Sequence, residues 1–581
     1  MQKQDAIRHL VLTLDRRCLI LCDKNHQKIL ILNRMDLYQA LANSYFDFLA
    51  ERFPVMCASD EFDFLPRAEN AAKHYDKIDR FEATAIEESI DQLKSFHQEF
   101  KAADGEAGDL EQTIDLDLLK ANTAGILIEL DTKRSWQYNP LLYLKIGFIG
   151  LDHALNKPAD NSYEVEDRTL ARLSGIPDIL QNGIDNIDSV PGTYYQASLR
   201  MAQDCKHYLA EVRRALLMRF PDHQSRVAKF IADARVALEK FDQFLASRSP
   251  EPDRQFAVST LETSLRDHFL SAHSANEIFA IAQYEWQAIL EKLKAIQSQI
   301  DENKTWEQLY HAYMPEPVAE SEIVALYKDE IHRLREFFSH NGFSEEWLSA
   351  PVKIEYTPTY LKSVRSSASF AAAFSRDPRE NSYFYISTHF PLYNCQVSDH
   401  HLQRRLNREY KMLTAHETIP GHHFLDSFRR KLANPIRRQI ESPLFYEGWA
   451  SYAESLLIEY NYLNDPLEAL VSLKRELWRS ARCQIDVGFT IGELSEPAAL
   501  DLLTTCGFDP TEASRQLDRF RLNPGYQLCY GYGSHQFKQL KKKYGHLSES
   551  KDFYTFLLAG GELPFHLIER RFEKQHQPEI I

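Results

Sequence analysis

The sequence predicts a mainly α-helical protein: one large helical body with a small β-sheet or hairpin near the candidate site. Apolar residues recur at helical spacing over residues 274–300. Two stretches, "VKIEYTPTY" at 352–360 and "SYFYISTHF" at 382–390, are instead rich in β-branched and aromatic residues. The 581 residues are enough for one such body. We expect an N-terminal helical half (1–314) and a C-terminal half with the site (315–581), joined in one structural unit.

Composition narrows the partners and the compartment. The formal net charge of −16 disfavours nucleic acid and anionic membrane surfaces as partners. The N-terminus lacks a secretory layout, and no run of eighteen apolar residues predicts a spanning helix. The eight cysteines are scattered, which is typical of reduced thiols, so we expect a cytoplasmic protein. Cys18 and Cys22 could share one helical face and bind a metal, but no second Cys or His pair lies nearby.

Two helices of the N-terminal half have clear boundaries. Ser274 and Glu277 form a capping box at the start of the 274–300 helix. A second periodic segment covers 176–187, where Pro177 suits the first turn of a helix. Pro315 and Pro317, in "AYMPEPVAESE", mark the boundary between the halves as a hinge.

The stretch that follows is expected to form strands. Turn formers in "SRDPREN" precede the second β-rich segment. The strand in "SYFYIST" (382–388) is either an ordinary sheet edge or an edge that pairs with an extended peptide substrate.

The chemistry concentrates at "HETIPGHH", residues 416–423. A helix through "LNREYKMLTA" would present His416 and Glu417, but Pro420 stands where a zinc motif needs its next histidine, one turn on. In a regular helix His423 lies about 10 Å further along the axis and His422 lies on another face. Pro420 and Gly421 prevent a regular helix, so a two-residue bulge would return His422 to the metal. The alternative is a helix that ends at Ile419 before two exposed histidines.

A second helix supplies carboxylates. In "SPLFYEGWASYAESLLIEY", Ser442 and Pro443 mark a helix start, and Glu447 and Glu454 lie seven residues apart on one apolar face. Buried carboxylates need a metal or an ion pair. A His-Glu helix followed by a helix with a glutamate is the layout of gluzincin peptidases. Pairing with Arg437, Arg438 or Lys474 is the structural alternative.

These motifs resemble the DUF885 family, whose pattern is HExxPGHH followed by EGWAxYAE. "LWRSARCQIDVGF" (477–489) and "NPGYQLCYGYG" (523–533) are similar to two further family segments, so the resemblance extends from about residue 165 onward. It implies a helical zinc metallopeptidase. The chain departs from the family at Thr490, where a histidine is common, and at Tyr526–Gln527, where Gln-Ala is usual.

The resemblance also implies roles for individual residues. The metal ligands are His416, His422 and Glu447. The catalytic residues are Glu417, as general base, and Tyr530, as oxyanion donor. Residues that would orient ligands or contact substrate are His423 (also the alternative second ligand), Glu454, Asp426, Asp486, Tyr526 and His535.

The predicted function is hydrolysis of unstructured oligopeptides with one zinc ion as cofactor. The oligomeric state and the choice between exo- and endopeptidase action stay open. Two other classes are considered: a degenerate enzyme that serves as a helical binding scaffold, and a di-metal oxidase of the helical type. The second is weak because the C-terminal half lacks a Glu-x-x-His pair at the right offset.

Overall fold

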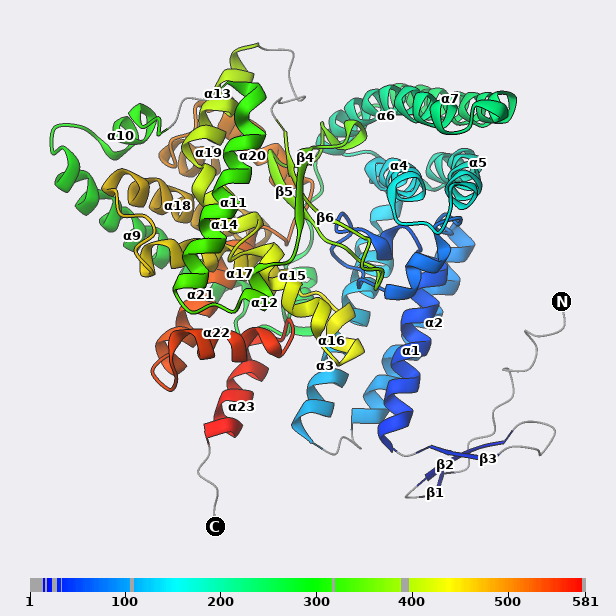
Figure 1. Ribbon diagram of the computed structural model, residues 1–581, viewed down its shortest axis with the longest axis horizontal. Helices are drawn as coiled ribbons and strands as arrows, with labels where there is room; N and C mark the ends of the chain where they lie inside the picture. Colours follow the sequence, from blue (N-terminus) through cyan, green and yellow to red (C-terminus); the bar gives the residue numbers. More distant parts are fainter. Residues whose placement is uncertain are drawn as a thin grey trace.

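The computed structural model is mainly α-helical, as predicted (Figure 1). It describes residues 14–15, 18–22, 29–32 and 34–576, apart from 105–108, 316–318 and 388–395. Within these residues, no helix is both long enough and apolar enough to cross a membrane.

The helices of the first half and of the segment after it run in chain order. They are α1 (Arg34–Arg52), α2 (Ala83–Asp104), α3 (Leu110–Leu127), α4 (Pro140–Asn156), α5 (Ser162–Asn186), α6 (Gly192–Arg219), α7 (Gln224–Ala246), α8 (Val258–Thr263), α9 (Ala275–Ile300), α10 (Trp306–Ala312), α11 (Ile323–His340) and α12 (Glu345–Leu348). Helices α1 to α7 lie together on one side of the molecule, whereas α9 and α10 lie with the C-terminal helices (Figure 1).

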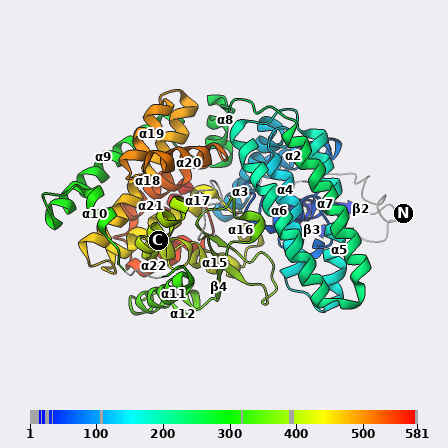
Figure 2. The same ribbon diagram turned by 90° about the horizontal axis from the view of Figure 1, so that it is seen from above.

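The C-terminal helices follow the second sheet. They are α13 (Gln396–Arg408), α14 (Tyr410–Glu417), α15 (His422–Lys431), α16 (Pro435–Gln439), α17 (Pro443–Glu459), α18 (Pro466–Ile491), α19 (Glu496–Thr505), α20 (Pro510–Arg521), α21 (Leu528–Tyr544), α22 (Ser550–Ala559) and α23 (Phe565–His576). Seen from above, α15, α16 and α17 lie between the two groups of helices (Figure 2).

Two three-stranded sheets are present. Near the N-terminus, β1 (Leu14–Asp15), β2 (Cys18–Cys22) and β3 (Ile29–Leu32) pair antiparallel. The second sheet contains β4 (Val352–Tyr356), β5 (Ala368–Ala371) and β6 (Ser382–Ile386) in the order β4-β6-β5. Its strands β4 and β6 are parallel, with Ile354 opposite Phe384, so the predicted small sheet is confirmed but is not a hairpin.

The position of β6 contradicts one expectation. This strand lies in the middle of its sheet and pairs with β4 on one side and β5 on the other. Because both of its backbone edges are already paired, β6 cannot add a substrate peptide as an edge strand. The edge strand β5 came from a segment of small residues, "ASFA", that lacks a strand signature.

Helix starts were predicted with mixed success. The capping box of Ser274 and Glu277 on α9 is confirmed, and α17 begins at Pro443 with Ser442 as its N-cap, also as predicted. Pro177 is instead inside α5, which begins at Ser162 after the Asn161 cap, so its expected place in a first turn is wrong. The segment with Cys18 and Cys22 is a strand rather than a helix, and its side chains lie outside the described residues.

Buried side chains connect the two groups of helices. One hydrophobic cluster contains residues from Ala42 on α1 to Phe572 on α23. The predicted hinge falls partly on 316–318, outside the described residues, so the division near residue 314 stays a prediction. Because the cluster is shared, the central helices α14, α15 and α17 have firm packing on both sides.

Candidate metal centre

Helices α14 and α15 are joined by a short break at Thr418–Gly421, where the Ile419–Pro420 peptide bond is cis. Two backbone hydrogen bonds cross it, from Gly421 N to Ala415 O (2.9 Å) and from Phe424 N to Thr418 O (3.1 Å). Each spans six residues instead of the four of an α-helix, so the break contains two extra residues. The predicted two-residue insertion is therefore present, but as a helix break and not as a bulge in a continuous helix.

Sequence and packing explain the break. Pro420 has no backbone N–H to continue the helix. Its carbonyl oxygen accepts a hydrogen bond from Trp449 Nε1 (2.9 Å), which fixes the break to α17. A Cβ atom at Gly421 would overlap the carbonyl oxygens of Ala415 and His416, so only glycine fits. The alternative of a helix that ends at Ile419 before exposed histidines is wrong, because His422 and His423 are both buried.

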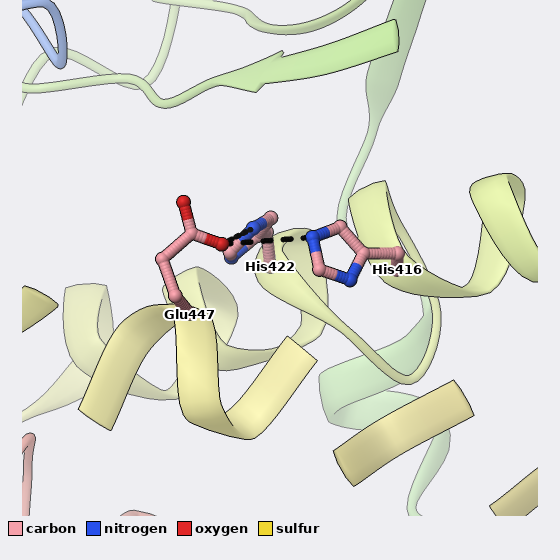
Figure 3. Close-up of side chains that lie close together, drawn as sticks. All are labelled: His416, His422 and Glu447. Carbon is pink, nitrogen blue, oxygen red and sulfur yellow. Dashed lines mark ion pairs between the residues drawn. The ribbon is translucent and has the colours of Figure 1, made fainter. Parts of the chain in front are cut away.

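The break brings three predicted ligands together. The Nε2 atoms of His416 and His422 lie 3.6 Å and 3.4 Å from Glu447 Oε2 (Figure 3). The two imidazole planes are at 81° to each other. No other group of three His, Cys, Asp or Glu side chains among the described residues is arranged to hold a metal ion.

The carboxylate of Glu447 is held at its other oxygen. Both Tyr526 and Tyr530 donate hydroxyl hydrogen bonds to Oε1, at 2.8 Å and 2.7 Å, which leaves Oε2 facing the imidazoles without a hydrogen bond. Burial opposes ionisation of Glu447, but the neighbouring His416 and His422 outweigh it and hold its pKa well below the ordinary value. Tyr530 thus lies at the site, with its hydroxyl engaged by a predicted ligand.

Glu454 contacts the far side of the His416 ring. Its Oε1 lies 3.1 Å from His416 Nδ1, and it accepts two hydrogen bonds from Arg475, both 2.8 Å, and others from Arg479. Such a carboxylate fixes the orientation and tautomer of an imidazole ligand. The alternative partners do not reach it: Arg437 pairs with Asp115, Arg438 with Glu69 and Lys474 with Glu409.

The two last histidines of the motif have different surroundings. The His422 ring stacks on Tyr446 at 4.0 Å, and its Nε2 faces Glu447. His423 instead has its Nε2 3.3 Å from the carbonyl oxygen of Pro351, and burial lowers its pKa to about 4. The geometry therefore places His422, and not His423, with the other two ligands.

Glu417 is the last residue of α14 and is buried. Among the described residues its carboxylate has no hydrogen-bond or ion-pair partner, in contrast to Glu447 and Glu454. A buried carboxylate beside the ligands and without a protein partner is available to exchange a proton with substrate or water.

The remaining predicted residues are more distant. Asp486 accepts hydrogen bonds from Gly525 N (2.7 Å) and Leu528 N (3.1 Å), so it holds the turn that carries the two tyrosines. Burial raises its pKa to about 6. Asp426 pairs with Arg67 and Arg429, and His535 contacts Glu285 on α9. Neither Asp426 nor His535 contacts a ligand, so the structure does not support their expected roles at the site.

Sequence reasoning missed the arginines that surround this centre. Arg475, Arg479 and Arg482 recur on α18 at steps of four and three and share a helical face with Asp486. Arg479 Nη2 lies 3.3 Å from His416 Nδ1. The signal was present in "LWRSARCQIDVGF", because cations on a largely apolar helix face require buried anions.

Comparison with known proteins identifies the family but no activity. The family model described as "Bacterial protein of unknown function (DUF885)" matches residues 67–572. A "putative lipoprotein of unknown function" from Shewanella oneidensis is 17% identical with a TM-score of 0.71, over 93% of this chain and 99% of that one. A "putative lipoprotein" from Colwellia psychrerythraea is 17% identical with a TM-score of 0.69, over 92% and 98%. No curated protein matched the sequence.

At such identities the two structures establish a shared fold alone. The family match covers most of the chain, so this protein belongs to the DUF885 family.

Proposed function

We propose that this member of the DUF885 family is a zinc-dependent peptidase with His416, His422 and Glu447 as metal ligands. The observation that carries the proposal is the buried Glu447 Oε2, which has no hydrogen bond and faces two imidazole nitrogens at 3.4 Å and 3.6 Å. Tetrahedral zinc with bonds of about 2.0–2.2 Å separates its ligand atoms by roughly 3.3–3.6 Å. The three donor atoms therefore fit one zinc ion, and two histidines with one glutamate leave a fourth position open.

A zinc ion bound there supplies Lewis acidity that activates water and polarises the scissile carbonyl. Glu417 takes a proton from the attacking water at its carboxylate and passes it to the leaving amine. Tyr526 and Tyr530 orient Glu447 through its Oε1, and Glu454 orients His416 through Nδ1. Tyr530 becomes an oxyanion donor only if its hydroxyl leaves Glu447 during the reaction.

Strand β5 is a suitable guide for an extended peptide. It is the edge strand of its sheet nearest the centre, and the Phe370 ring lies 5.7 Å from the ring of His423 and 6.5 Å from that of His422. An unstructured oligopeptide can pair its backbone with such an edge and place a peptide bond beside the ligands.

The test combines metal content with cleavage. We expect one zinc ion per chain by mass spectrometry and chelator-sensitive digestion of a peptide library. The Glu417→Gln variant should keep its zinc but cleave about 10²–10⁴-fold more slowly, because the proton acceptor is lost. His422→Ala should lose the metal, and its neighbour His423→Ala serves as the matched control that keeps it.

Three results would contradict parts of this proposal. Wild-type cleavage rates for Glu417→Gln would remove the general base, and loss of zinc only in His423→Ala would reverse the ligand assignment. Bound zinc without chelator-sensitive cleavage of any peptide would favour the scaffold alternative. Two metal ions per chain would favour a di-metal centre.

A further inference from the structure

A cavity of about 240 Å³ adjoins the proposed metal centre on the side of the two tyrosines. Tyr526 and Tyr530 line it, and the same two hydroxyls bind Glu447 Oε1. The cavity and the ligand carboxylate are therefore separated by the length of one tyrosine side chain. Arg482 and Arg519 also line this cavity.

Arg482 is positioned without an anion. Its Nε and Nη2 donate hydrogen bonds to Gln527 Oε1, and its guanidinium carbon lies 3.5 Å from the centre of the Tyr530 ring. No carboxylate pairs with it among the described residues. The neutral amide and the aromatic ring fix the orientation of the guanidinium group but leave its charge uncompensated.

Arg519 is the second uncompensated cation. It has no hydrogen-bond or ion-pair partner within the described part of the chain, and its side chain is exposed to this cavity and to a neighbouring one of about 360 Å³. Burial, together with repulsion from Arg482, lowers the pKa of Arg519 to about 10. Two such cations near each other are costly unless an anion lies close to both.

The other charged groups of the cavity do not supply this anion. Lys145 pairs with Glu61 at 2.7 Å, and Lys133 pairs with Glu129 at 3.6 Å. Asp63 accepts a hydrogen bond from Asn523, and burial raises its pKa, which favours the neutral carboxyl. The positive charge of the two arginines is thus left for a ligand.

We propose that Arg482 and Arg519 bind the C-terminal carboxylate of the substrate, so that the enzyme removes short pieces from the C-termini of peptides. This inference rests on the proposed peptidase function. Guanidinium groups bind carboxylates through strong paired hydrogen bonds. An extended residue spans about 3.5 Å, so a carboxylate at Arg482 places a bond one or two residues upstream beside the ligands.

The experiment compares two forms of one peptide. The probe is an N-acetylated, alanine-rich hexapeptide without Asp or Glu, as the free acid and as the C-terminal amide. Binding is measured by calorimetry on zinc-loaded Glu417→Gln protein, and cleavage positions by mass spectrometry on the wild type. We expect the free acid to bind at least about tenfold more tightly, a difference of about 1.4 kcal/mol. Cleavage should fall within the last two residues.

Variants assign this preference to the arginines. Arg519→Gln or Arg482→Gln, each combined with Glu417→Gln, should weaken binding of the acid and leave binding of the amide unchanged. Arg519→Lys should restore part of the preference, and circular dichroism checks that each variant is folded. Arg226→Gln on α7, an exposed arginine that pairs weakly with Asp167, is the control and should change neither.

Each contrary result has a distinct meaning. Equal affinity for acid and amide, or equal weakening of both by the arginine variants, would overturn the inference even if the protein is a peptidase. A preference for the acid without any hydrolysis would sink the peptidase proposal but keep the carboxylate site. An amide peptide with an internal Glu that binds as tightly as the acid would assign the site to acidic side chains instead.

Discussion

At the scale of single residues, Glu454 links the predicted ligand His416 to two buried arginines. Replacing it by Gln removes the negative charge that faces His416 Nδ1, Arg475 and Arg479. Zinc affinity should fall about 10–100-fold because the imidazole loses its orienting carboxylate. The free energy of unfolding should also fall by about 3 kcal/mol, since a buried ion pair loses one partner. Zinc titration and urea unfolding measure the two effects.

Glu409 offers a matched control for Glu454→Gln. It is also fully buried and also pairs with Arg475, at 2.7 Å, but it belongs to the junction between α13 and α14. Glu409→Gln should destabilise the protein comparably and leave zinc affinity unchanged. If both variants lose zinc equally, Glu454 acts through general stability and not through His416.

How far single residues could be predicted depends on how local their signal is. His416, His422 and Glu447 belong to two short motifs, and helical geometry was enough to propose that they meet. Tyr526 and Tyr530 were expected near the site, but their shared contact with Glu447 Oε1 arises from the packing of α21 on α17. His535 was misplaced because its helix face turns towards Glu285 on α9, which sequence periodicity does not reveal.

At the scale of elements, α17 and α21 approach closely at two glycines. A Cβ atom at Gly533 would lie 2.6 Å from Gly448 Cα and would overlap the carbonyl oxygen of Leu444. Gly533→Ala should therefore force the helices apart, although alanine itself favours a helix by about 1 kcal/mol. The shift would separate Tyr530 from Glu447, so we expect a lower melting temperature and weaker zinc binding. Calorimetry and zinc titration measure both.

The control for this contact is another glycine inside a helix. A Cβ atom at Gly147 on α4 would meet Ile179 at 3.5 Å, an ordinary contact. Gly147→Ala should be neutral or stabilising and should leave zinc binding unchanged. A Gly533→Ala variant that matches Gly147→Ala in both measurements would show that the close approach has no functional importance.

The elements also show what sequence patterns miss. The 274–300 helix was predicted with its cap because both signals are local. The start of α5 was misplaced because Pro177, a common first-turn residue, is tolerated inside that helix. The end of α14 at Glu417 depends on hydrogen bonds across six residues and on Trp449 from another helix. Periodicity alone could predict the distortion but not its form.

At the scale of the whole molecule, several carboxyl groups are buried far from the proposed metal centre. Asp79 accepts hydrogen bonds from Val55 N (2.6 Å) and Met56 N (3.2 Å), just after α1. Burial raises its pKa to about 7, and burial beside Glu441 raises that of Glu562 to about 8. Each group favours the protonated form in the folded protein, so folding takes up protons at neutral pH.

The sign of the resulting pH dependence follows from Asp79. An unfolded Asp has a pKa of about 3.9. Between about pH 4 and 7 the unfolded chain is ionised at this position while the folded protein stays protonated, so the free energy of unfolding falls as pH rises, by up to about 1.4 kcal/mol per pH unit. Above pH 7 this contribution levels off. Asp79→Asn does not titrate, so its stability should fall less steeply over the same range.

Urea unfolding of chelator-treated protein at several values between pH 4 and 8 tests this linkage for the molecule as a whole. Asp76→Asn is the matched control, because Asp76 is exposed on the same segment and should leave the slope unchanged. The comparison of slopes is independent of any constant loss of stability that the Asp79 substitution causes. Parallel curves for wild type and Asp79→Asn would mean that Asp79 is ionised in the folded protein, with its charge stabilised by the two backbone N–H groups after α1.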